Sequence, residues 1–192
     1  MDFFHSATFS WDGSVVNFID ESFADVAGEC PPTTPAGAPI GGDSGRMFFL
    51  DAATGAKLSH FMIDRPAETD YCSAHMGLPV PTTDGSKLIV NAWYLGGANV
   101  VDFTDPTNPV EVAFYDAAPP GPAGQDNWSA YWYEGPQFGG DSLTIYASDG
   151  VHDPAAVQAA GRGFDVFRVD GLSTDVNFDH LNPQTQERVL PG

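Results

Sequence analysis

The alternation of apolar and polar residues is clearest between Ala98 and Tyr115. Two short runs, ANVVDF and VEVAFY, are rich in β-branched and aromatic residues, and the segment TDPTNP between them holds two prolines. Proline fixes φ and lacks a backbone donor, which suits a turn between paired strands. These residues therefore predict a β-hairpin, and residues 45–63 and 161–175 repeat the strand, turn and strand pattern.

A second kind of hairpin precedes each of these three. Segments that begin at His5, His75 and Asn127 read as a strand, a polar turn with Asp-Gly or Glu-Gly, and another strand. The repeating unit is thus four consecutive antiparallel strands, predicted for residues 5–70, 71–116 and 126–175. Such units in series are typical of β-propeller blades, so we expect an all-β protein.

Two segments outside this repeat carry separate expectations. Residues 153–161, DPAAVQAAG, are the only stretch for which we expect a helical turn, because alanines follow an N-terminal Asp-Pro. Residues 176–192 show no clear strand alternation, and we expect them to pack across the ring as a tail.

The segment ANVVDFTDPTNPVEVAFYD resembles the LVIVD-repeat proteins. The five-residue core of the repeat falls on Ala98–Asp102, and the same Asp-Pro-x-Asn-Pro turn follows it. The segments HSATFSWDG, YCSAHMGLPVP and NWSAYWYEG are similar to the C-terminal half of longer bacterial members, which are generally exported and have no established activity. Ala98 and Asn99 depart from the aliphatic residues of the repeat, as does Arg168 near its aspartate in the third unit.

Three blades are too few to close a ring, since propellers have about four to eight. The resemblance implies a ring of six or seven blades in which the remaining blades lie in the same chain. A second copy that completes the ring is an alternative, and an open arc capped by a partner is another.

Charge limits the partners of this 192-residue chain. The 26 acidic residues against 7 basic residues give a formal net charge of −19, which repels phosphate backbones and anionic lipid head groups. We therefore expect neither nucleic acid as a partner nor, without an apolar run of about 20 residues, insertion into a membrane. Cationic ligands, divalent metals, small molecules and proteins remain open as partners.

The two cysteines, Cys30 and Cys72, each lie in a turn-like segment. An even count without a C-x-x-C motif favours a disulfide, although two free thiols are the alternative. A disulfide implies an exported, extracellular or cell-surface protein. The segment MDFFHSATFS does not read as a secretory signal, so the signal is then expected upstream of Met1.

Polar residues recur where the first strands begin and the second strands end. First strands line the channel of a propeller, so two imidazoles and an amide are expected to meet there as ligands of a divalent or transition metal. The alternative is that these polar groups satisfy one another and the channel water. The predicted metal ligands are His5, His75, Asp20 and Asn127, and the predicted channel-lining residues are Glu21, Asn91, Trp128 and Asp149.

Two functions therefore remain open. One is a binding module that recognises a protein or a small molecule through its loops, above all the insertion at residues 22–44. The other is a metalloenzyme, a hydrolase or an oxidoreductase, with its metal on the propeller axis. The sequence holds no H-E-x-x-H or D-x-D-x-D-G motif that would decide between them.

Overall fold

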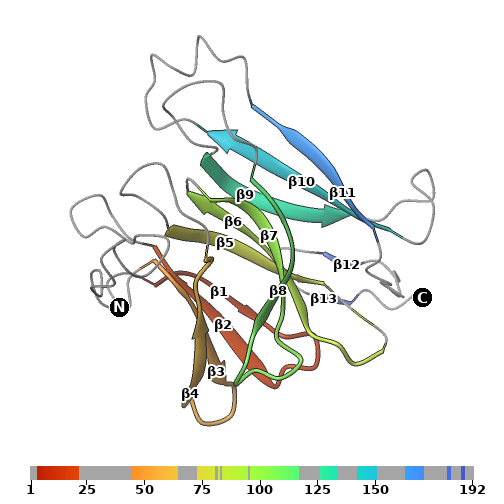
Figure 1. The fold of residues 1–192 in the computed structure, drawn as a ribbon. Coiled ribbons are helices and arrows are strands. Elements are labelled where there is room, and N and C mark those ends of the chain that lie inside the picture. The colour runs from red at the N-terminus through yellow and green to blue at the C-terminus, as the bar shows by residue number, and fades with distance from the viewer. Residues whose placement is uncertain are drawn as a thin grey trace.

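The computed structural model describes residues 4–21, 45–64, 73–80, 82, 84–94, 96–116, 126–133, 142–150, 163–170, 181–182 and 187–188. These residues form an all-β structure without a helix (Figure 1). In this part of the chain no helix is long and apolar enough to cross a membrane. The helical turn expected at residues 153–161 and the disulfide expected between Cys30 and Cys72 lie outside the described residues.

The first sheet consists of four sequential antiparallel strands in the order β1-β2-β3-β4. Its strands are β1 (Phe4–Phe9), β2 (Val15–Asp20), β3 (Met47–Asp51) and β4 (Lys57–Phe61). The second sheet repeats this order as β5-β6-β7-β8. Its strands are β5 (Ser73–Val80), β6 (Leu88–Tyr94), β7 (Gly97–Asp102) and β8 (Val110–Tyr115). The hairpin predicted from the TDPTNP turn is therefore confirmed.

The third sheet has the described order β11-β10-β9. It contains β9 (Asp126–Tyr133), β10 (Ser142–Gly150) and β11 (Asp165–Asp170). The rest of the third predicted unit, residues 171–175, lies beyond the described residues. A short ladder of β12 (Leu181–Asn182) and β13 (Glu187–Arg188) occurs in the segment where the sequence predicted no strands.

The three sheets stack like consecutive propeller blades in an open arrangement (Figure 1). The first strand of each sheet is innermost, because β1 contacts β5 and β5 contacts β9. One apolar core fills the space between the first and second sheets, and another fills the space between the second and third. The first core includes Ile19, Met47, Phe49, Ile89 and Trp93, and the second includes Leu78, Val90, Val100, Trp132 and Ile145.

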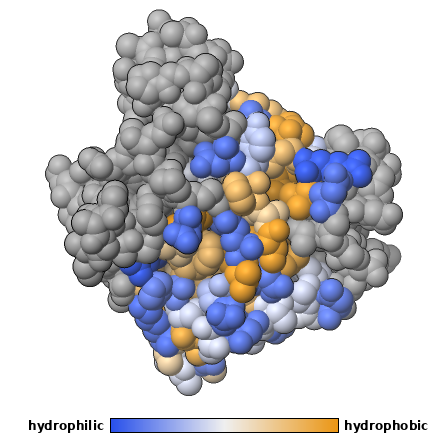
Figure 2. All heavy atoms as spheres, viewed as in Figure 1, coloured by the Kyte–Doolittle hydropathy of each residue, from blue (hydrophilic) through white to orange (hydrophobic). Residues whose placement is uncertain are grey.

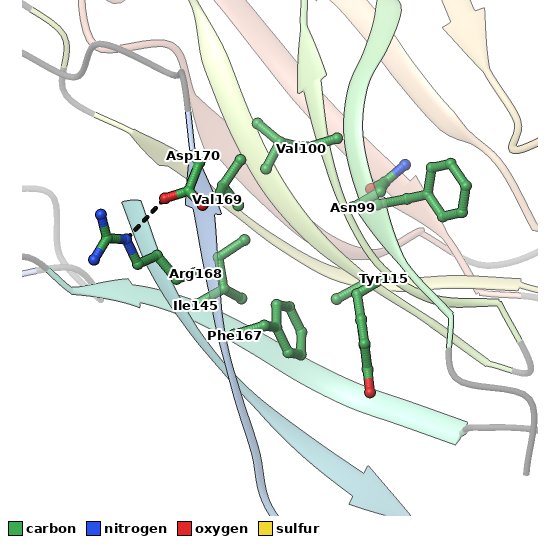
Figure 3. A pocket seen from close by; sticks show the side chains of 11 residues that line it. Asn99, Val100, Tyr115, Ile145, Phe167, Arg168, Val169 and Asp170 are labelled. Carbon is green, nitrogen blue, oxygen red and sulfur yellow. Dashed lines mark hydrogen bonds and ion pairs between the residues drawn. The ribbon is translucent and has the colours of Figure 1, made fainter. Parts of the chain in front are cut away.

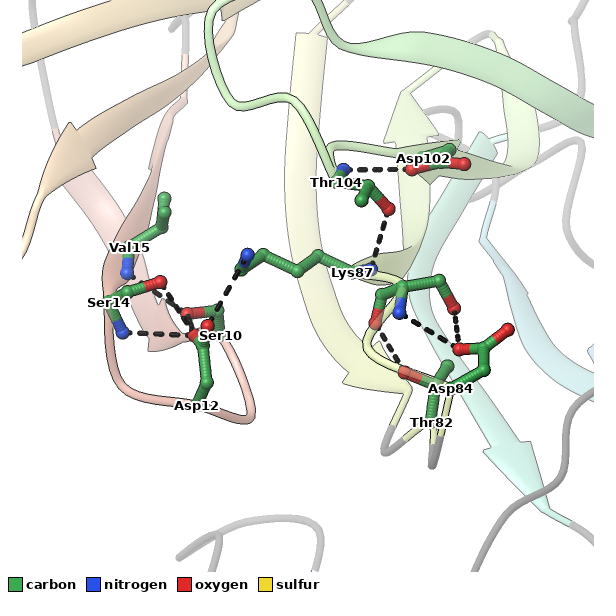
Figure 4. A network of polar contacts seen from close by, with 10 residues as sticks. Ser10, Asp12, Ser14, Val15, Thr82, Asp84, Lys87, Asp102 and Thr104 are labelled. Atoms are coloured by element: carbon green, nitrogen blue, oxygen red, sulfur yellow. Dashed lines mark hydrogen bonds and ion pairs between the residues drawn. The ribbon is translucent and has the colours of Figure 1, made fainter.

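Polar turns tie the first two sheets together at one end of the inner strands (Figure 4). Asp12, in the turn between β1 and β2, accepts hydrogen bonds from the hydroxyls of Ser10 and Ser14 at 2.6 and 2.7 Å. Its other carboxylate oxygen lies 3.3 Å from Nζ of Lys87, which precedes β6. The backbone N–H of Lys87 donates to Oγ1 of Thr104. The opposite ends of β1 and β5 carry His5 and His75.

Candidate metal centre

Each innermost strand carries an irregularity in its pairing with the next strand. In the first sheet the register passes from Phe4↔Asp20 to Ser6↔Ile19, so that His5 is the extra residue of a β-bulge. The same shift leaves out His75 in the second sheet and Trp128 in the third. Bulges of this kind re-aim side chains and are common beside functional sites. The three blades thus present His5, His75 and Trp128 at equivalent positions.

This equivalence corrects the alignment made from the sequence. The sequence predicted that Asn127 meets His5 and His75 where the first strands begin, whereas the strand register places Trp128 level with the two histidines. Asn127 instead pairs with Asp149 across the ladder. A shift of one residue matters in a strand because successive side chains point to opposite faces.

His5, Glu21 and His75 form one cluster. One potential ligand atom from each of the three lies within 4.8 Å of the other two. The Nε2 atoms of His5 and His75 lie 3.6 and 3.7 Å from the two carboxylate oxygens of Glu21. The two imidazoles stack, with 4.3 Å between ring centroids and 28° between their planes. The proximity of His5 and His75 that the sequence predicted is therefore present.

Backbone carbonyls fix the tautomers of both histidines. Nδ1 of His5 lies 3.2 Å from the carbonyl oxygen of His75, and Nδ1 of His75 contacts the carbonyl oxygen of Trp128. A carbonyl oxygen only accepts hydrogen bonds, so each Nδ1 carries a proton and donates it. In the neutral imidazole the lone pair is then on Nε2, the atom that faces Glu21. The same contact, made twice between successive blades, orients both rings.

Burial keeps His75 neutral. The pKa of His75 is lowered from its ordinary value, first because burial disfavours the imidazolium and also because His5 lies beside it. The hydrogen bond to the Trp128 carbonyl and the charge of Glu21 act in the opposite direction but do not outweigh burial. A neutral imidazole is the form that binds a metal ion.

Tyr94 supports the carboxylate of the cluster. Its hydroxyl donates a hydrogen bond of 2.9 Å to Oε1 of Glu21, and both residues are buried. The Tyr94 ring lies against that of His75, with 4.6 Å between centroids, and meets the ring of Trp128 edge-on at 5.8 Å. Tyr94 therefore holds one residue of the cluster by a hydrogen bond and another by ring contact.

Asp20, which the sequence predicted as a ligand, lies outside the cluster. It pairs across the ladder with Phe4, whose ring packs on Phe18 and Phe48. Cross-strand partners share a face, so Asp20 faces away from the second sheet. Glu21, the next residue along the chain, occurs in the cluster in its place. The sequence had placed Glu21 among the channel-lining residues, as a carboxylate neighbour of the histidines, and had not placed it among the predicted metal ligands.

Trp128 lies beside His75, with 5.9 Å between ring centroids, and the structure also places the other predicted residues. Asn127 is fully buried, and neither its amide nitrogen nor its amide oxygen has a hydrogen-bond partner. Buried orphan groups of this kind are often satisfied by water or an ion. Asn91 is buried in a side-chain network in which its amide donates to Oδ1 of Asn99. Asp149 lies on β10, and Trp128 is 45% exposed.

The donor set fits a transition-metal ion. Two ligands about 2.1 Å from a tetrahedral centre are about 3.4 Å apart, close to the observed nitrogen to oxygen separations. Those separations exceed the usual range for hydrogen bonds. The backbone-bonded Nδ1 atoms are the supporting contacts that metal-binding histidines normally have. The exposed side of His5, whose side chain is 35% accessible, lets an ion enter from solvent.

A separate cavity of about 200 Å³ opens between the second and third sheets (Figure 3). Its wall is largely apolar, and the ring of Phe167 stacks on that of Tyr115 at 4.9 Å. Arg168 and Asp170 at its edge form an ion pair of 2.9 Å. Figure 2, drawn in the view of Figure 1, shows apolar residues interspersed with hydrophilic ones in the middle of that face. This cavity holds no cluster of metal-ligating groups among the described residues.

Comparison with known proteins gives no match. No protein-family model, no curated protein and no solved structure is significantly similar to this chain. The case for a function therefore depends on the geometry of the site.

Proposed function

We propose that this chain is part of a β-propeller metalloenzyme that binds a transition-metal ion through His5, His75 and Glu21. The observation that carries the proposal is the orientation of the two imidazoles. Both donate from Nδ1 to a backbone carbonyl, so both Nε2 lone pairs face one carboxylate, at 3.6 and 3.7 Å. Lone pairs of the imidazoles repel the carboxylate that they face, and a cation bound between the three groups removes this repulsion.

The donor types support a transition metal over calcium or magnesium. Imidazole nitrogen suits zinc, iron, copper and nickel, whereas calcium and magnesium prefer sites made of oxygen ligands. Two histidines and one carboxylate occur in catalytic zinc sites and in non-haem iron oxygenases. The formal charge of −19 also attracts cations to the protein.

Three protein ligands leave positions for water and substrate on the ion. When bound, the ion supplies either activation of water or redox chemistry, according to its identity. The protein residues orient the ligands: the carbonyls of His75 and Trp128 hold the imidazoles, and Tyr94 holds Glu21. This set of contacts favours the metalloenzyme over a binding module without a metal.

Membership of the LVIVD-repeat proteins and export from the cell are part of the proposal. The residues Ala98–Asp102 with the following turn support the first, and the cysteine pair supports the second. Intact-mass measurement after alkylation, with and without reductant, tests the Cys30–Cys72 bond. Two alkylated thiols in the unreduced protein would remove the argument for export.

Metal titration tests the site directly. Protein stripped with a chelator is titrated with zinc, iron(II), manganese and copper by calorimetry, and bound metal is counted by mass spectrometry. His5→Ala, His75→Ala and Glu21→Gln should each weaken binding by at least about 100-fold, more than the loss of a supporting contact.

The matched control is His60→Ala. His60 lies on the outermost strand β4, and its Nε2 contacts Nη1 of Arg46 at 2.7 Å. The variant therefore removes an imidazole that lies away from the cluster. Its metal affinity should equal that of the unchanged protein. Equal affinities in all four variants, or no uptake of any of these metals, would contradict the metal centre and favour the binding module.

A further inference from the structure

We propose that Trp128 forms the binding wall for a planar aromatic group of the substrate, whose oxygen donor takes an open position on the metal. This inference rests on the proposed metal centre and assigns its substrate class. It starts from the equivalence of the three bulge positions, which hold an imidazole in the first two blades and an indole in the third.

The three sheets contribute different kinds of side chain to the site. All three proposed ligands come from the first two sheets, because His5 and Glu21 belong to the first and His75 to the second. The third sheet contributes Trp128 at the position where a third histidine would complete the set. The indole of Trp128 does not bind a metal ion, but it lies at the position equivalent to the two histidine ligands. It can therefore contact a molecule that is bound to the metal.

Contacts place the indole beside the site. The ring centroid of Trp128 lies 5.9 Å from that of His75, and its backbone carbonyl accepts the His75 Nδ1 proton. Tyr94, only 3% exposed, supports the indole edge-on at 5.8 Å. Trp128 itself is 45% exposed. A supported aromatic ring thus faces solvent next to the imidazole of His75.

The chemistry of the Trp128 indole indicates which class of molecule binds beside the metal. An exposed indole is stabilised when an apolar surface covers it, and stacked or edge-to-face aromatic pairs are stabilised beyond that burial. The negative charge of the protein disfavours polyanionic substrates. An aromatic compound with a small oxygen-containing group that binds metals, such as a phenol or an aromatic acid derivative, can cover the indole and is not a polyanion.

Two hydroxamates that share one chelating group provide the probes. Benzohydroxamate carries a phenyl ring, and acetohydroxamate carries a methyl group in its place. Their dissociation constants are measured by calorimetry on the zinc-loaded protein. The change in the ratio of the two constants between the unchanged protein and a Trp128 variant reports the contact with Trp128. We expect benzohydroxamate to bind about tenfold more tightly, and Trp128→Ala to reduce this preference to within about twofold.

Matched variants separate the wall from general effects on folding. Trp11→Ala removes another exposed tryptophan, in the turn between β1 and β2, and should leave the tenfold ratio unchanged. Trp128→Phe retains an aromatic ring and should retain most of the preference. Zinc stoichiometry, measured on each variant, establishes that the metal centre is intact.

The outcomes distinguish the two proposals. A full zinc content with the same ratio in Trp128→Ala and in the unchanged protein would overturn the aromatic wall and leave the metal centre in place. Failure of the unchanged protein to take up zinc or any other transition metal would overturn the metal centre and, with it, this inference.

Discussion

Removing the hydroxyl of Tyr94 tests how the site is held together. The change Tyr94→Phe deletes one oxygen atom, which donates a 2.9 Å hydrogen bond to Oε1 of Glu21. The ring contact with His75, at 4.6 Å between centroids, does not depend on the hydroxyl and should persist. The variant therefore isolates the hydrogen bond from the packing.

The size of the effect follows from burial and charge. Tyr94 is 3% exposed and Glu21 is 7% exposed, so water cannot readily replace the lost donor. A buried hydrogen bond to a charged group contributes about 1.5–3 kcal/mol, and we expect the free energy of unfolding of the metal-free protein to fall by about 2 kcal/mol. Metal affinity should fall by about 10- to 100-fold, because Glu21 loses the contact that orients it.

Urea unfolding measures the first effect, and metal calorimetry measures the second. Tyr131→Phe is the control, because within the described part of the chain the Tyr131 hydroxyl contacts Sδ of Met76, a weak acceptor, at 3.8 Å. It should change the free energy of unfolding by less than about 0.5 kcal/mol and leave metal affinity unchanged. If Tyr94→Phe behaves like Tyr131→Phe in both assays, Tyr94 does not hold Glu21 and the account of the site is wrong.

Two further predictions concern the scaffold. Burial tends to raise the pKa of Asp12, but hydrogen bonds from Ser10 and Ser14 and the nearby Lys87 outweigh it and lower that pKa well below its ordinary value. Because the folded-state pKa is below the unfolded one, Asp12 stabilises the protein above about pH 4, and this stability is lost as the pH falls through the folded pKa. Urea midpoints at pH 7 and pH 3 should therefore differ less in Asp12→Asn than in the unchanged protein, and equal differences would count against the turn network. Gly97→Ala should lower the free energy of unfolding by roughly 3 kcal/mol or more, since Gly97 has φ +71° and an added Cβ would lie 2.1 Å from the Tyr115 carbonyl oxygen. Gly13→Ala, at φ +70° with no atom within 4 Å of the added Cβ, should cost only about 1 kcal/mol in the same urea assay, and similar losses in both variants would refute the steric argument.

The sequence by itself determined the local structure. Alternating residues and Gly, Pro and Asp turns predicted the strands of the first two sheets and their antiparallel order, because hairpin pairing depends on residues close together in the chain. The same reasoning identified His5 and His75, which begin the first strands of two successive units. It placed Glu21 near the histidines but preferred Asp20 as the ligand. The alternation of β2 held a signal for Glu21, because if Asp20 faces outward, the next residue faces inward.

The tertiary structure decided which side chains meet. A bulge in each inner strand adds one residue to the register, and neither the presence nor the place of a bulge follows from hydrophobic alternation. The shift puts Trp128 rather than Asn127 level with the histidines and lets the carbonyls of one blade bind the imidazoles of the blade before it. Contacts between blades join residues about 50 to 70 positions apart, such as Tyr94 with Glu21, and only the stacking of the sheets brings such residues together.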